Sequence, residues 1–248
     1  MTEGYAEFEF DLPAALLERL VWRFDDIQAA SLLPKVVANV PEAQGVYQLL
    51  LNDELVYIGK TDAAKGLRNR LARHATTIQH RRNLLLANVT FKAIRVFVFT
   101  AMDLEAQLID HYGGVAWQHS GFGSNDPGRN RDGTKLKPGG FDELYPIDLD
   151  QPLEYDFSKA KTVGEVFSGL KSTLPYLFRY ERLPKDVSGI QMSVDGEYPT
   201  AWEIVTSALG VLPAGWQATD LYSRLILYRE SKDYVHGHIV GRSTSGQP

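Results

Sequence analysis

The sequence predicts an α+β fold in which helices flank a small antiparallel sheet of three strands. Two short apolar runs, GVYQLLL and ELVYIG, are separated by turn-forming residues, which is typical of a β-hairpin. A third run, FKAIRVFVFT, is rich in β-branched and aromatic residues and is expected to complete the sheet. Apolar residues recur at helical spacing from Leu67 to Ala75, which indicates a helix packed on that sheet.

Composition excludes several classes of protein. The 248 residues contain 44% apolar residues and no apolar run long enough to span a bilayer. The first residues lack the basic and apolar regions of a secretory signal, so we expect a cytoplasmic protein without membrane association. The absence of cysteine excludes disulfides and thiolate metal sites.

The chain order predicts an N-terminal extension at 1–42, before the sheet. Residues 5–11 alternate as an edge strand does. A helix is expected from Pro13 to about Phe24, and a short helix or loop at 30–42.

The predicted hairpin carries two tyrosines ten residues apart, Tyr47 and Tyr57. Side chains alternate between the faces of a strand, so the two rings share a face only if the hairpin loop has an odd number of residues. A three-residue loop at 52–54 pairs Tyr47 with Gly59 and brings the rings together. A two-residue loop would separate them.

The helix after the hairpin is basic, and Arg70 and His74 share one of its faces at i, i+4 spacing. A second helix is expected at 76–87. The net charge is −5, yet the segment from Lys60 to Arg95 holds nine Lys or Arg and one acid. Such a stripe is compatible with a nucleic-acid interface; the alternative is a solvated basic face.

The motifs GVY, VYIG and LRNRLARH resemble the signature of the GIY-YIG nuclease superfamily, over residues 43–120. The first motif reads GVY in place of GIY. The positions that match the superfamily pattern are Tyr47, Tyr57, Lys60, Arg70, His74 and Glu105. The His and a later Gly-rich run are most similar to type II restriction enzymes of the SacII-isoschizomer group, which implies the target CCGCGG.

The resemblance implies a role for each position. Tyr47 positions or deprotonates the attacking water, cations near it favour phenolate, and His74 accepts the phenolic proton. Arg70 clamps the phosphate, and Tyr57 orients phosphate or water. Lys60 is one of the cations. Glu105 binds one Mg²⁺, with Mn²⁺ as a substitute.

One position departs from the superfamily pattern. The superfamily usually has an Asn about twelve residues after the Glu, and Trp117-Gln118 stands there in this chain. Gln118 is one candidate for closing the site, and Asn125 is the other.

Residues 113–140 hold eight glycines and little periodicity, so we expect a long loop. Arg and Asn read guanine and adenine edges in the major groove. The predicted DNA-contacting residues are Arg68, Arg73, Arg81 and Arg82 in the basic segment, and Asn125, Arg129, Asn130 and Arg131 in the loop. The alternative is a flexible surface loop.

Residues 121–248, the loop and a C-terminal extension, are expected to form one continuous domain with the core. Helices are predicted at 162–170 and 200–209, and a final hairpin from LYSRLILYRE and YVHGHIVGR.

Together these features predict a sequence-specific type II restriction endonuclease that cleaves double-stranded DNA at a GC-rich palindrome. A homodimer supplies the required two-fold symmetry, and a cognate DNA methyltransferase is the expected genetic partner. The alternatives are a GIY-YIG repair or mobile-element nuclease and a non-catalytic DNA-binding module.

Overall fold

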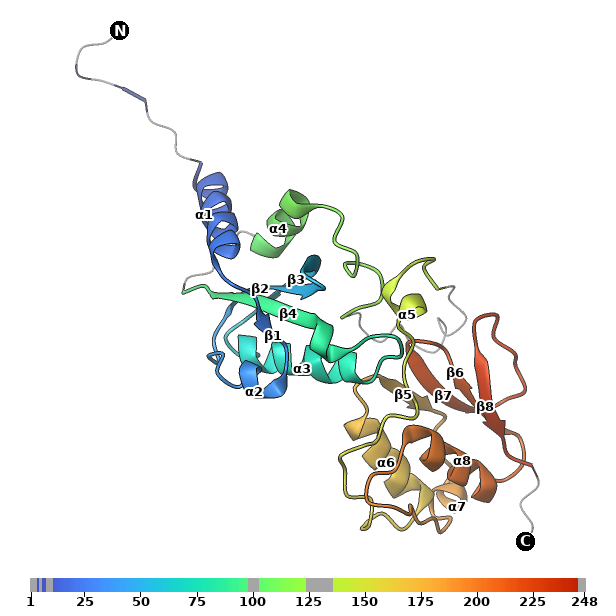
Figure 1. Ribbon diagram of the computed structural model, residues 1–248. Helices are drawn as coiled ribbons and strands as arrows, with labels where there is room; N and C mark the ends of the chain where they lie inside the picture. Colours follow the sequence, from blue (N-terminus) through green and yellow to red (C-terminus); the bar gives the residue numbers. More distant parts are fainter. Residues whose placement is uncertain (1–3, 5, 8–10, 98–102, 124–135, 245–248) are drawn as a thin grey trace. The chain divides into compact units, whose positions relative to one another are not determined.

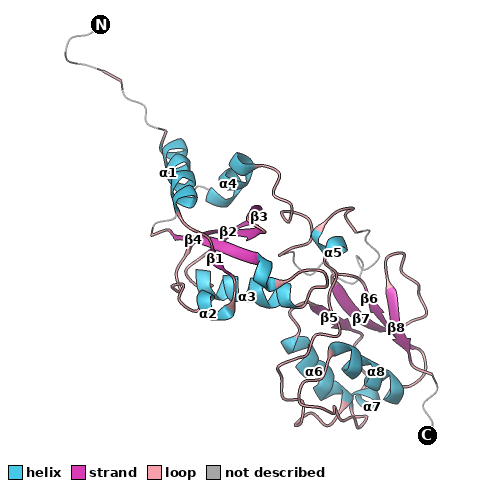
Figure 2. Cartoon of the chain, in the orientation of Figure 1, coloured by secondary structure: helices cyan, strands magenta, loops and turns pink. Residues whose placement is uncertain are grey.

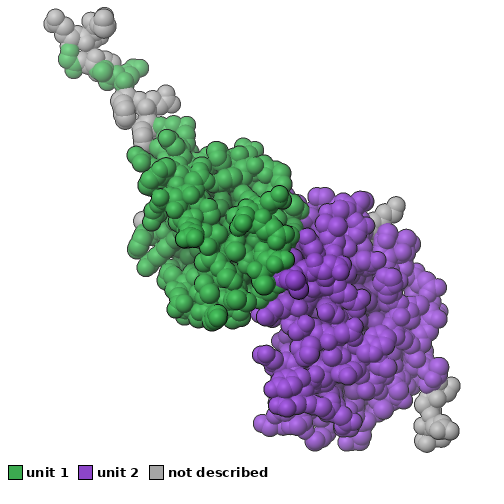
Figure 3. Space-filling model, viewed as in Figure 1, with its two compact units in different colours: residues 1–75, 86–118 green, residues 76–85, 119–248 purple. Residues whose placement is uncertain are grey.

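The computed structural model describes residues 4, 6–7, 11–97, 103–123 and 136–244. The chain divides into two compact units (Figure 3). Unit 1 comprises residues 1–75 and 86–118, and unit 2 comprises residues 76–85 and 119–248. Each unit has a four-stranded sheet with helices packed on it (Figure 1), which confirms the α+β class.

The sheet of unit 1 has one more strand than predicted. Its strands are β1 (Ala30–Ser31), β2 (Gly45–Leu51), β3 (Glu54–Thr61) and β4 (Val89–Arg95). Their order is β1-β4-β2-β3, and every pair is antiparallel. The additional strand, β1, lies where a helix or loop was expected and pairs Ala30 with Phe91. It is only two residues long, too short to show the alternation by which strands are recognised.

Helices cover both faces of this sheet (Figures 1 and 2). The helices are α1 (Leu12–Asp26), α2 (Pro34–Val37), α3 (Leu67–Gln79) and α4 (Leu104–Tyr112), with a 3₁₀ turn η1 (Leu86–Asn88). On one face, α1 and α4 enclose a core that includes Phe24, Val46, Ile58 and Leu108. In the described ranges, no helix has the length and apolar character needed to cross a bilayer.

One predicted element differs from the structure, and another cannot be compared with it. The predicted second helix at 76–87 is absent, because α3 ends at Gln79 and the chain then turns, with Arg81 bridging to Ile147. The predicted strand at 5–11 lies mostly outside the described residues. By contrast, the helix predicted from Pro13 is confirmed as α1.

The hairpin reaches the predicted register by a different route. Its turn has two residues, Asn52 and Asp53, because Leu51 pairs with Glu54. Both turn residues have positive φ, 50° and 68°, as a type I′ turn requires. By simple alternation this turn would place Tyr47 and Tyr57 on opposite faces, as the sequence argument states.

A β-bulge restores the alignment. The pairing shifts between Leu49 and Leu50, so that Leu49 pairs with Tyr57 while Leu50 pairs with Leu55, and Val56 is the extra residue. An extra residue in one strand shifts every later position by one and changes the face to which it belongs. Beyond the bulge Tyr47 pairs with Gly59, as predicted, and both tyrosines lie on one face.

Unit 2 has its own sheet and hydrophobic core. The strands are β5 (Leu177–Tyr180), β6 (Trp216–Asp220), β7 (Arg224–Arg229) and β8 (His238–Arg242), in the order β5-β7-β6-β8. The helices are α5 (Phe141–Leu144), α6 (Val163–Thr173), α7 (Lys185–Ser188) and α8 (Ala201–Val211). The prediction of one continuous domain did not include this second sheet and core, in which Phe167, Ile204 and Leu227 are fully or almost fully buried.

The two long helices of unit 2 are confirmed, and both start in the same way. Thr162 and Thr200 each cap a helix while a Glu three residues later bonds back to the cap, which is a capping box. The predicted final hairpin is wrong, since β8 pairs with β6 and not with β7. In the sheet, β6 lies between β7 and β8. It is buried at every position and therefore shows no alternation of buried and exposed residues.

The left-handed turn predicts opposite effects for two substitutions. Asp53→Val should lower the free energy of unfolding by about 1–2 kcal/mol, because a β-branched residue is strained at φ 68°. Asp53→Gly should leave the free energy of unfolding unchanged or raise it, since Gly adopts this conformation without strain. Urea unfolding of both variants measures this. Equal stability of the two variants would contradict the turn geometry.

Candidate functional site

The site is built around the hydroxyl of Tyr47, a fully buried side chain in the middle of β2. Arg70 Nε donates to this oxygen at 3.2 Å, and His74 Nε2 lies 2.7 Å from it. A guanidinium nitrogen can only donate, so the phenol oxygen is the acceptor from Arg70. The geometry is satisfied when the phenol hydrogen points to His74 Nε2, which places the imidazole proton on Nδ1.

Helix α3 delivers both partners of the phenol. Leu67, Leu71 and Ala75 are buried at helical spacing and hold α3 against the sheet, as the sequence predicts. Arg70 and His74, four residues apart, therefore share the adjacent face and reach β2 together. The predicted grouping of these side chains is confirmed by the two contacts with Tyr47.

Gly59 makes room for the phenol. It lies directly across from Tyr47 in the β2–β3 pairing. A Cβ at position 59 would lie 2.3 Å from the Tyr47 hydroxyl oxygen and 2.4 Å from the ring carbon that bears it. Both distances are far below van der Waals contact, so any larger residue forces the ring to move. Sequence analysis assigns Gly59 no role, although it is part of the VYIG motif.

Tyr57 completes an aromatic group on the same face. Its ring centroid lies 6.2 Å from that of Tyr47 and 5.5 Å from that of His74. The ring is buried, tilted against that of Tyr47 and edge-on to that of His74. The group is thus a packed set of three rings whose two phenol oxygens lie beside Arg70.

Burial keeps the acid–base groups neutral. Burial raises the pKa of Tyr47 above its ordinary value, the neighbouring Tyr57 adds to this, and Arg70 offsets only part of it. Burial also holds the pKa of His74 well below its usual range, and the charges of Arg70 and Arg73 lower it further. The expectation that nearby cations favour a Tyr47 phenolate is therefore corrected, because desolvation outweighs them.

Arg70 carries a positive charge beside two phenols. Burial acts to lower the pKa of its guanidinium, yet Tyr47 and Tyr57 raise it, so the group stays charged. In the described ranges no carboxylate forms an ion pair with Arg70. A half-buried guanidinium that is hydrogen-bonded to phenols is suited to bind an anion, and its planar donor fork matches phosphate.

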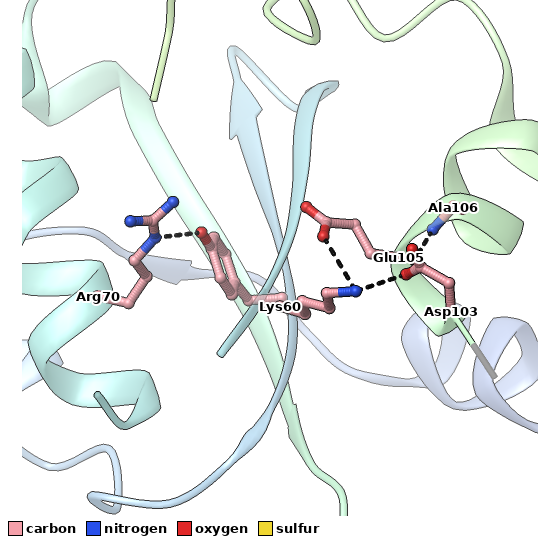
Figure 4. Close-up of polar contacts among 6 residues, drawn as sticks. Lys60, Arg70, Asp103, Glu105 and Ala106 are labelled. Carbon is pink, nitrogen blue, oxygen red and sulfur yellow. Dashed lines mark hydrogen bonds and ion pairs between the residues drawn. The ribbon is translucent and has the colours of Figure 1, made fainter. Parts of the chain in front are cut away.

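Glu105 approaches the phenols from α4. Its side chain is 24% exposed, and its charge raises the pKa of both Tyr47 and Tyr57, which places the carboxylate close to them. Figure 4 shows Glu105 and Lys60 converging from α4 and β3. Lys60 Nζ lies 3.9 Å from Glu105 Oε2 but only 2.7 Å from Asp103 Oδ1.

Sequence analysis gave Asp103 no part in the site. It is the N-cap of α4, with its Oδ1 accepting from Ala106 N at 3.4 Å. An Asp immediately before an apolar helical pattern is the signal that identifies such a cap. Lys60, predicted as a catalytic cation, is thus engaged with the start of α4.

Glu105 is the one predicted metal ligand. Within the described part of the chain, no group of three or more His, Cys, Asp or Glu side chains is arranged to hold a metal ion. A cation at Glu105 would therefore take most of its ligands from water and substrate. Mg²⁺ is commonly bound in this way, by one or two carboxylates and phosphate oxygens, so the residues present fit this ion.

Gln118 lies at the exposed edge of the sheet. Its side-chain oxygen accepts from Ile58 N at 3.3 Å, and Trp117 N donates to Val56 O at 2.8 Å. These two residues thus attach the chain after α4 to β3, beside Tyr57 and Gly59. The other candidate for the closing position, Asn125, lies outside the described residues.

Two predicted DNA contacts on α3 are at the surface. Arg68 is exposed, donates through Nε to Val40 O at 2.8 Å and lies 3.7 Å from Glu42. Arg73 is exposed on the same helix. Their positions are compatible with contacts to a polyanion.

Two further arginines belong to unit 2, and one prediction is corrected there. Arg81 is only 8% exposed, its Nη1 donates to Asp142 at 2.8 Å and to Tyr145 O at 3.0 Å, and its guanidinium stacks on Phe141. It therefore serves the fold and is not available to DNA. Arg82 is exposed, close to two aspartates. The remaining predicted contacts, Arg129, Asn130 and Arg131, lie outside the described residues.

The close approach at Gly59 predicts a large effect of one added methyl group. Gly59→Ala should lower the free energy of unfolding by about 1–3 kcal/mol, the usual cost of overpacking. Gly210→Ala is the matched control: this glycine lies inside α8 with no atom within 4 Å of the added Cβ, so the free energy of unfolding should rise by about 0.5–1 kcal/mol. Chemical denaturation tests both. A Gly59→Ala protein as stable as the wild type would disprove the contact.

The buried His74 predicts a pH effect with a defined sign. Its folded-state pKa lies below the ordinary 6.5, so the unfolded chain takes up the proton first as the pH falls, and stability is lost below about 6.5. From pH 6.5 to 5.5 the wild type should lose up to about 1 kcal/mol more than His74→Gln in urea unfolding. His111→Gln, an exposed position on α4, should match the wild type. Equal pH slopes for wild type and His74→Gln would refute the assignment.

Comparison with protein-family models and with curated proteins finds no match for the chain.

Proposed function

We propose that unit 1 hydrolyses phosphodiester bonds in double-stranded DNA by GIY-YIG chemistry, and that the chain is a sequence-specific type II restriction endonuclease. The observation that carries this proposal is the buried Tyr47 hydroxyl held between Arg70 Nε and His74 Nε2. A buried phenol between a cation and a neutral imidazole has the parts needed to orient a water and transfer its proton. The resemblance of the three motifs points to the same reaction.

Arg70 is the proposed phosphate ligand. Its charge is not neutralised by an acid in the described part of the chain, and a scissile phosphate would supply the missing anion. Two parallel N–H···O bonds would orient the phosphate next to the Tyr47 oxygen. Tyr57, whose ring lies against Tyr47, is placed to orient phosphate or water.

Tyr47 and His74 are the proposed proton path. The water oxygen bonds to phosphorus as the bond to the leaving 3′ oxygen breaks, and the water proton passes to Tyr47 while the phenol proton passes to His74 Nε2. Because the two proton transfers occur together, no free phenolate forms on Tyr47. Burial would make such a phenolate costly. The low pKa of His74 keeps its imidazole unprotonated at neutral pH and able to accept.

Glu105 would hold the cation, Mg²⁺ or in its place Mn²⁺. When bound, such an ion supplies charge that stabilises the leaving oxygen. The carboxylate is half-buried, and its charge raises the pKa of both phenols, so Glu105 would hold the cation where its charge acts on the same groups. Lys60 Nζ lies 3.9 Å from this carboxylate, beyond hydrogen-bond distance. The cation that bonds directly to the Tyr47 phenol is Arg70.

The palindromic target, the homodimer and the methyltransferase are inferred from the resemblance to restriction enzymes. A double-strand break at a GC-rich palindrome needs two such sites related by a two-fold axis, hence a homodimer. A nuclease that cuts its host's own sequence requires a cognate DNA methyltransferase, and both act in the cytoplasm. The exposed Arg68 and Arg73 on α3 would contact the phosphate backbone.

The experiment that tests the function is digestion of genomic DNA by the full-length protein with Mg²⁺, followed by sequencing of the DNA ends. Ends that share one short palindrome support the restriction function. Single-strand nicks without a common sequence would indicate a repair-type nuclease, and DNA binding without new ends would indicate a non-catalytic module. Either outcome overturns the restriction proposal.

Glu105→Gln should lower the rate of cleavage at least about 100-fold, because the amide cannot replace the carboxylate as a cation ligand. DNA binding should stay within about tenfold, since each decade corresponds to only about 1.4 kcal/mol. Asp110→Asn is the matched control, removing the same charge from an exposed position of the same helix. Cleavage and gel-shift assays measure the two effects. Normal cleavage by Glu105→Gln would exclude Glu105 as the ligand.

A further inference from the structure

We infer that Asp103 holds the ammonium group of Lys60 away from Glu105 and thereby keeps the Glu105 carboxylate available to a divalent cation. The inference rests on the proposed function and assigns a new role to two residues of this chain. Asp103 would be a positioning residue, since it acts on the site through Lys60. Lys60, in turn, would be a restrained competitor of the cation rather than a catalytic group.

The geometry is that of one ammonium between two carboxylates (Figure 4). Lys60 Nζ is 2.7 Å from Asp103 Oδ1, a hydrogen-bond distance, and 3.9 Å from Glu105 Oε2, which is beyond it. The Lys60 ammonium therefore donates its hydrogen bond to Asp103 and not to Glu105. Both carboxylates stand within two residues of each other at the start of α4, so the ammonium needs only a small movement to change partner.

Asp103 is well placed to retain the ammonium. It is the N-cap of α4, and the same oxygen that binds Lys60 also accepts from Ala106 N. Its position is thus fixed by the helix start, whereas the lysine stem is flexible.

An ammonium on Glu105 would oppose cation binding in two ways. It would occupy the carboxylate oxygens that the cation needs, and its charge would repel the cation at a distance of a few ångström. Lys60, Asp103 and Glu105 together carry a net charge of −1. Loss of the Asp103 charge makes this local charge zero, and loss of the Lys60 charge makes it −2.

The two charge losses should therefore change metal binding in opposite directions. Asp103→Asn should weaken it, and Lys60→Met should strengthen it. Asn is as good an N-cap as Asp, so Asp103→Asn keeps the start of α4 intact. If the Lys60–Asp103 pair only fixed α4 in place, both substitutions would weaken metal binding.

The test is Mn²⁺ binding to the full-length protein, measured by electron paramagnetic resonance, together with the Mg²⁺ dependence of genomic-DNA cleavage. Asp103→Asn should raise the half-saturating concentration of either ion about threefold to tenfold, and Lys60→Met should lower it by a similar factor. The double variant should bind more tightly than Asp103→Asn alone. Asp110→Asn on the same helix controls for general loss of charge.

Each outcome is decisive. If Glu105→Gln abolishes Mn²⁺ binding and cleavage while Asp103→Asn and Lys60→Met change the metal requirement in the same direction, or not at all, the role of Asp103 is disproved and the proposed function stands. If the wild type binds no more Mn²⁺ than Glu105→Gln and cleaves no DNA, both proposals are overturned. Opposite shifts support the inference.

Discussion

The arrangement of unit 1 depends on how one buried hydroxyl obtains its hydrogen bonds. Tyr47 is fully buried in the central part of the sheet, where an unpaired phenol would be costly. Arg70 and His74 supply a donor and an acceptor, and both come from one face of α3. The burial of Leu67, Leu71 and Ala75 against the sheet sets the rotation of α3 about its own axis, and this rotation presents Arg70 and His74 to the Tyr47 hydroxyl. The packing of the helix and the chemistry of the site therefore depend on the same orientation of α3.

The electrostatic properties of the site follow from this burial. The environment disfavours charge on Tyr47 and His74, while Arg70 keeps its charge because its guanidinium is hydrogen-bonded to phenol oxygens, which offsets the effect of burial. Two neutral proton carriers thus lie beside one fixed cation. Such a site does not change protonation around neutral pH in the absence of substrate. It differs from a site that relies on a preformed phenolate, which is the picture that residue types alone suggest.

Sequence reasoning identified the site residues better than the connections between them. Tyr47, Arg70 and His74 were grouped correctly because strand and helix periodicities are local properties. The bulge at Val56 was not predictable, because its signal is a pairing between strands and not a residue type, and the predicted register was reached only because the bulge offset the shorter turn. The partner of Lys60 is Asp103, and their contact depends on the start of α4 lying next to β3, which no local pattern indicates. Likewise the burial of Arg81 depends on Asp142, 61 residues away, and no local pattern indicates it.

The backbone bonds made by Trp117 and Gln118 have a consequence for self-association. β3 is one of the two outer strands of the unit 1 sheet, and an outer strand with free backbone groups is a template for strands of other molecules. Val56 O and Ile58 N, in the middle of this edge, are already engaged by those two residues. A strand from another molecule would have to displace them before it could extend the sheet. The same short segment that borders the site thus protects unit 1 against edge-to-edge aggregation.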